Sequence, residues 1–150
     1  MPDEAEILLR FWQEQRDQAK QSEDQRAVMT NIILIISSAG VGLVAKQGVD
    51  DRSMILVAVP LIVLGIVGAL TSLKYRERFE LHIGEARLYR RQLDTLYPSL
   101  RLERRWQILR VAHRARHPLL NRVRLYHLWT FIPFVVAITG LGLTIAIAVA

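Results

Sequence analysis

Three long runs without a charged residue constrain this chain more than any other feature of its sequence. They cover residues 27–45, 53–73 and 128–150 and contain 19, 21 and 23 residues respectively. A helix of about 20 residues crosses the roughly 30 Å of hydrocarbon in a bilayer. The runs are apolar on nearly all sides, whereas a soluble helix keeps one polar face. We therefore predict an all-α membrane protein with three transmembrane helices.

The basic residues are concentrated in one segment between these runs. Residues 74–127 hold 14 of the 20 Lys and Arg residues together with five carboxylates, which gives a net charge of +9. Loops of up to about 60 residues that are rich in Lys and Arg stay in the cytoplasm. We therefore expect the N-terminus and residues 74–127 in the cytoplasm. The turn 46–52 and the C-terminus are then expected outside a plasma membrane, which for a bacterium is the inner membrane.

This topology divides the chain into four parts. Residues 1–26 are predicted to form a polar or amphipathic cytoplasmic helix, and residues 27–73 a hairpin of two spans. Residues 74–127 are predicted to form a basic cytoplasmic hairpin of two helices, because Pro98 disfavours helix at the residue before it. Residues 128–150 form the third span. Positive charge beside a bilayer favours anionic lipid headgroups, so we do not expect nucleic acid as a partner.

Two patterns predict helix packing or self-association. Apolar and small residues recur at alternating steps of four and three after the second run, as in a heptad seam. This seam consists of Tyr75, Phe79, His82, Ala86, Tyr89, Leu93 and Leu96. Pairs of small residues four apart, which let membrane helices approach closely, occur in every run. They are Ser38 and Gly42, Gly65 and Ala69, Gly140 and Thr144, and Gly142 and Ala146.

The sequence offers little for catalysis. No ionisable residue lies inside the three runs, which disfavours proton relays, coupled transport and voltage sensing. The chain has no cysteine, and we find no phosphate loop and no Ser/His/Asp set, so we predict neither enzyme activity nor a cofactor. His113 and His117 have the i, i+4 spacing of a metal pair, but Arg114 and Arg116 would repel a cation. We therefore predict no metal site.

The segment between the second and third runs does offer candidate anion contacts. Arginine forks recognise phosphate, and six arginines could hold a phosphate or a lipid headgroup there. These are Arg90, Arg91, Arg104, Arg105, Arg114 and Arg116. The alternative interpretation is a basic surface that is solvated and faces lipid without binding a specific ligand.

The order of a polar helix, two spans and the segment KYRERFELHIGEARLYRRQLDTLYP resembles the SLATT group of small bacterial membrane proteins. The resemblance covers residues 13–98 and rests on this architecture and on the run Tyr75, Arg76, Glu77 and Arg78. SLATT proteins are two-span modules with a cytoplasmic helical extension, so the third span is an addition here. The resemblance implies an inner-membrane effector of nucleotide-signalled antiphage defence that assembles and permeabilises the membrane when a cytoplasmic sensor signals.

Three functional hypotheses follow. The first is an oligomeric, pore-forming effector controlled by its basic cytoplasmic hairpin. Its partners would be the lipid bilayer, further copies of the chain, and a cytoplasmic sensor or nucleotide signal. The second is an accessory or scaffold subunit that recruits a cytoplasmic partner. The third is a small channel or transporter with constitutive activity.

Overall fold

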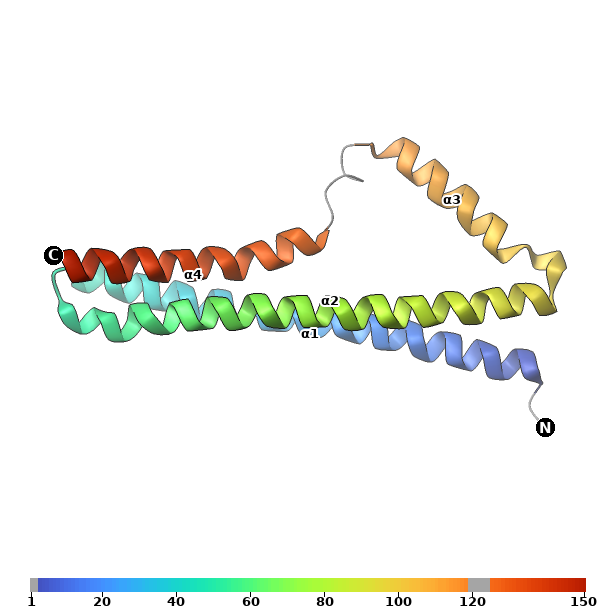
Figure 1. Ribbon diagram of the computed structural model, residues 1–150, viewed down its shortest axis with the longest axis horizontal. Coiled ribbons are helices and arrows are strands. Elements are labelled where there is room, and N and C mark those ends of the chain that lie inside the picture. The colour runs from blue at the N-terminus through green and yellow to red at the C-terminus, as the bar shows by residue number, and fades with distance from the viewer. Residues whose placement is uncertain (1–2, 119–124) are drawn as a thin grey trace. The chain divides into compact units, whose positions relative to one another are not determined.

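The computed structural model describes residues 3–118 and 125–150, and all regular structure in these residues is helical. The α-helices are α1 (Glu4–Gln47), α2 (Ile55–Leu96), α3 (Leu102–Arg116) and α4 (Leu125–Val149), with short 3₁₀ turns η1 (Arg52–Met54) and η2 (Pro98–Leu100) (Figure 1). α1, α2 and α4 each contain a stretch long and apolar enough to cross a membrane. The structure thus confirms the all-α prediction and the three candidate spans, and it indicates a multi-pass membrane protein.

The chain separates into two compact units. The apolar unit comprises Asp24–Tyr75 and Leu125–Ala150, and the polar unit comprises Met1–Glu23 and Arg76–Arg124. α1 and α2 each run through both units, with one end in the apolar unit and the other end in the polar unit. No helix-breaking residue interrupts either helix at the boundary between the units. Pro60 lies within α2, but its missing N–H does not end the helix.

Within the apolar unit, α2 and α4 touch along their backbones. A Cβ atom added at Gly65 would stand 2.6 Å from the carbonyl oxygen of Pro133 and even closer to the backbone of Ala137. A Cβ atom at Gly140 would stand 2.8 Å from the backbone nitrogen of Ile62. Both glycines are buried. Membrane helices gain stability from such close approach because lipid supplies no hydrophobic driving force between them.

α1 packs onto this pair of helices through a narrow stripe. A Cβ atom at Gly40 would lie 3.2 Å from the Leu61 side chain, so α1 approaches α2 closely there. Near the turn between α1 and α2, Val44, Ala58 and Ile147 form a buried cluster that joins all three helices. Lipid-facing side chains surround this core, which explains why many large apolar residues of the unit are exposed.

The turn after α1 is stabilised by Asp51. Its carboxylate accepts a hydrogen bond from the Ser53 backbone N–H at 2.9 Å, and Gly48 adopts a positive φ of 90°. Hydrogen bonds from the Ser53 side chain, and then from its backbone, lower the pKa of Asp51. The carboxylate form therefore caps η1.

In the polar unit, α1 covers the seam of α2. The rings of Phe11 and Tyr89 stack with centroids 5.6 Å apart. The Gln15 side-chain oxygen lies 2.7 Å from the Nδ1 atom of His82. Ala19 on α1 is also buried. The seam pattern predicts helix packing or self-association, and in the structure α1 of the same chain covers much of the seam.

α3 joins α2 at a tight corner. Arg101 has a left-handed backbone with φ of 48°, and α3 begins at the next residue. The Asp94 carboxylate accepts hydrogen bonds from the backbone N–H groups of Leu102 at 2.6 Å and Glu103 at 3.3 Å. These are free N–H groups of a helix start, so Asp94 caps α3 from the preceding helix.

Candidate functional site

A groove opens between α1 and α4 in the apolar unit. Its volume is about 510 Å³. It is lined by Leu34, Ser37, Ser38, Val41, Gly42, Leu61, Val135, Val136 and Thr139. α2 contributes only Leu61 to this lining, so the groove is mainly a separation between the other two helices.

The groove has polar groups that lipid tails cannot satisfy. Ser37 is 7% exposed, and its Oγ atom is buried without a hydrogen-bond partner in the described part of the chain. Ser38 is exposed on the same helix, and Thr139 lies half-buried on α4. A buried hydroxyl without a partner costs free energy in hydrocarbon, where water cannot replace the missing bond.

Gly42 makes the groove accessible to another backbone. It is exposed, and a Cβ atom added to it would meet nothing within 4 Å. Gly65 and Gly140, by contrast, are filled by packing within the chain. Gly42 lies one helical turn after Ser38, and two small residues at this spacing let membrane helices approach closely.

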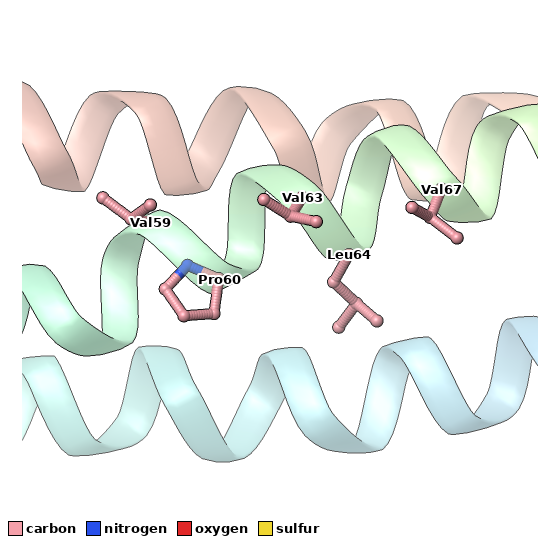
Figure 2. A pocket seen from close by; sticks show the side chains of 5 residues that line it. All are labelled: Val59, Pro60, Val63, Leu64 and Val67. Atoms are coloured by element: carbon pink, nitrogen blue, oxygen red, sulfur yellow. The ribbon is translucent and has the colours of Figure 1, made fainter.

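A second hollow, on α2, has a different chemistry. It measures about 440 Å³ and is lined by Val59, Pro60, Val63, Leu64 and Val67. Figure 2 shows these five side chains along α2, with the ribbons of α1 and α4 on either side. All five are apolar, so they offer no directional contact. This hollow suits lipid chains rather than a specific partner.

A buried cation lies at the start of the first span. Arg26 is only 7% exposed, and its guanidinium carbon lies 5.4 Å from the centre of the Trp129 ring. The Thr30 hydroxyl donates to the Arg26 carbonyl oxygen at 2.9 Å. By sequence, Arg26 belongs to the predicted polar helix 1–26, and its contact with Trp129 was not predicted. Tryptophan and arginine at the ends of apolar runs are the available signal.

The structure divides the predicted small-residue pairs into two classes. Gly65 and Gly140 pack within the chain, Ala69 and Thr144 are half-buried, and the Thr144 hydroxyl donates to the Gly140 carbonyl oxygen at 2.8 Å. The other pairs face outward: Ser38, Gly42, Gly142 and Ala146 are all exposed. Pro133, which no pair included, is buried and approaches both Gly65 and Gly68.

The seam residues lie mostly on one buried face. Tyr75 is half-buried in the apolar unit. In the polar unit Ala86 is buried, Leu96 is exposed, and the other four residues are half-buried: Phe79, His82, Tyr89 and Leu93. Together with the α1 contacts, this placement gives the seam an intrachain role.

The six arginines differ in their surroundings. Arg90 is half-buried, donates to the Glu103 carboxylate at 2.8 Å and stands 4.6 Å from the centre of the Trp106 ring. Its guanidinium therefore fastens α3 to α2. The other five are exposed: Arg91, Arg104, Arg105, Arg114 and Arg116. Arg110 is not among the six predicted contacts, and its guanidinium carbon lies 4.9 Å from the centre of the Trp106 ring.

The two candidate metal ligands are neighbours without a third. The rings of His113 and His117 have centroids 5.0 Å apart. Among the described residues, no group of three or more His, Cys, Asp or Glu side chains could hold a metal ion. The geometry therefore offers no argument for a metal centre in that part of the chain.

Comparisons of the chain with protein-family models, with curated proteins and with solved structures found no match.

Proposed function

We propose that this protein is a homo-oligomeric membrane effector that permeabilises the bilayer on assembly. It acts without enzymatic chemistry, and its polar unit lies in the cytoplasm as the control element. The resemblance to SLATT proteins motivates the effector role and a cytoplasmic sensor or nucleotide signal upstream. The observation that carries assembly is the groove between α1 and α4, with its bare Gly42 and its exposed Ser38.

A second copy would fill the groove with the matching surface of its own α1. In a two-fold pair the same α1 surface meets itself, so Ser38 and Gly42 of one copy approach the same residues of its partner. Because the three runs contain no ionisable residue, a pathway between assembled copies would be walled by apolar and hydroxyl groups, as in a hydrophobic gate.

Disulfide crosslinking tests the assembly directly, because the chain has no native cysteine. Gly42→Cys should form a covalent dimer in vesicles when a lipid-soluble oxidant is added, since a disulfide needs Cα atoms about 4.4–6.8 Å apart. Val63→Cys is the matched control, because Val63 is 56% exposed on the purely apolar hollow of α2 (Figure 2).

We expect dimer from Gly42→Cys and from Ser38→Cys, and little from Val63→Cys. Equal crosslinking at all three positions would indicate random collisions. No crosslinking at Gly42 or Ser38, at the same protein density, would show that the groove is not the assembly surface.

A further inference from the structure

The second half of α3 leaves an apolar stripe uncovered. Ile108, Val111, Ala112 and Ala115 follow the i, i+3, i+4, i+7 spacing of one helix face, and all four are exposed. Ile108 and Val111 are 60% and 67% exposed. This face differs from the one that meets α2, which uses Leu102 and Trp106, both half-buried.

Arginines border this stripe. At about 100° per residue, Arg105 and Arg116 lie along one edge, Arg114 lies beyond the other, and Arg104 precedes Ile108 by one turn. α3 contains five arginines and one glutamate, a net charge of +4, and that glutamate, Glu103, is paired with Arg90. An exposed aliphatic face bordered by arginines is typical of a helix that lies on an anionic membrane surface.

The covalent chain keeps α3 near the membrane. Eight residues separate Arg116, the end of α3, from Leu125, the start of the candidate span α4. Even fully extended, such a link reaches only about 30 Å. Once α4 is inserted, the link therefore keeps α3 close to the bilayer surface, at a high effective concentration of lipid.

We propose that α3 leaves its contacts with Arg90 and Asp94 of α2 and docks its stripe on the anionic surface of the same bilayer that the chain spans. The aliphatic side chains enter the headgroup boundary, while the arginines reach lipid phosphates with their stems lying along the apolar surface. A soluble phosphate compound would leave the aliphatic stripe in water. A second copy would bring two sets of arginines together and be repelled. The inference requires that the chain spans a membrane, but it does not depend on assembly or on a pore.

The test uses the whole chain at one copy per lipid nanodisc, with a nitroxide label on a single cysteine. One label replaces Ile108 (Ile108→Cys), and the matched control replaces Gln107 (Gln107→Cys), which is exposed off the stripe. A water-soluble relaxation agent reports accessibility in nanodiscs of phosphatidylcholine alone or with phosphatidylglycerol. The measurement needs only one inserted copy in each nanodisc. Its result therefore does not depend on whether copies crosslink at Gly42.

We expect accessibility at position 108 to fall roughly fivefold or more when anionic lipid is added, since each surface cation strengthens partitioning by about that factor. Position 107 should stay accessible. Replacing Arg104, Arg105, Arg114 and Arg116 with Gln should restore accessibility at position 108, and high salt should weaken the protection.

Three outcomes would overturn the proposal. Equal accessibility at both positions in anionic lipid would mean that the stripe stays in water. Protection at position 108 only when a disc holds two or more copies would assign the stripe to a second copy. Protection that appears in neutral lipid only with added inorganic phosphate would assign the arginines to a soluble anion.

Discussion

Glycines within the helices of the apolar unit are either packed against a facing helix or open, and substitution distinguishes the two classes. At Gly65 and Gly140 a methyl group would collide with the backbone of the facing helix, whereas Gly42 and Gly142 have open space around the same position. Sequence spacing alone cannot distinguish these cases, because all four glycines belong to similar small-residue pairs. The distinction comes from which face each helix turns toward its neighbour.

Gly65→Ala should destabilise the contact between α2 and α4 by about 1–3 kcal/mol, because the backbones must separate to admit the methyl group. Gly142→Ala should be close to neutral, since nothing lies within 4 Å of its added Cβ atom. Unfolding in mixed micelles with increasing denaturing detergent measures both. Equal stability of the two variants would contradict the close contact at Gly65.

At the scale of elements, the corner between α2 and α3 depends on contacts made by single side chains. No residue of α3 is buried in this structure, which describes the whole of that helix. A helix of 15 residues is only marginally stable alone. Asp94 and Arg90 therefore supply much of what holds α3 in place.

Asp94→Ala should lower the stability of α3 by about 1 kcal/mol, because two N–H groups at its start lose their cap. Hydrogen exchange of the Leu102 and Glu103 amides should speed up several-fold. Gln92→Ala, at an exposed position on α2, is the control and should leave these amides unchanged. If Asp94→Ala and Gln92→Ala exchange at the same rate, the cap does not stabilise the helix start.

The positions of the helices were easier to predict from the sequence than the contacts between them. Charge-free length predicted the three candidate spans, and Pro98 predicted the end of α2, which falls at Leu96. The seam of α2 was visible in its steps of four and three. Part of its cover is apolar, because Phe11 of α1 stacks on Tyr89. The rest comes from Gln15 and Ala19, which carry little apolar signal. The contacts of Arg90 and Asp94 at the corner depend on tertiary geometry, so periodicity could not indicate them.

At the scale of the whole molecule, the structure separates an apolar unit from a charged, polar unit. The outward-facing groove of the apolar unit and the exposed stripe of α3 were not predictable as surfaces. Both arise because neighbouring helices leave particular side chains uncovered. In our proposals, copies of the chain meet at the groove, and α3 binds the anionic surface of the bilayer that the spans cross.

Leakage of dye from anionic vesicles tests the proposed function most directly. The comparison is between the wild type, Gly42→Leu, which adds a side chain where a Cβ atom would meet nothing within 4 Å, and Val63→Leu, a matched control at an exposed position of α2. We predict leakage that rises more steeply than linearly with the protein-to-lipid ratio in the wild type and in Val63→Leu, and is lost in Gly42→Leu at equal insertion. Absence of leakage in the wild type, or equal leakage in all three proteins, would contradict permeabilisation through assembly at this groove.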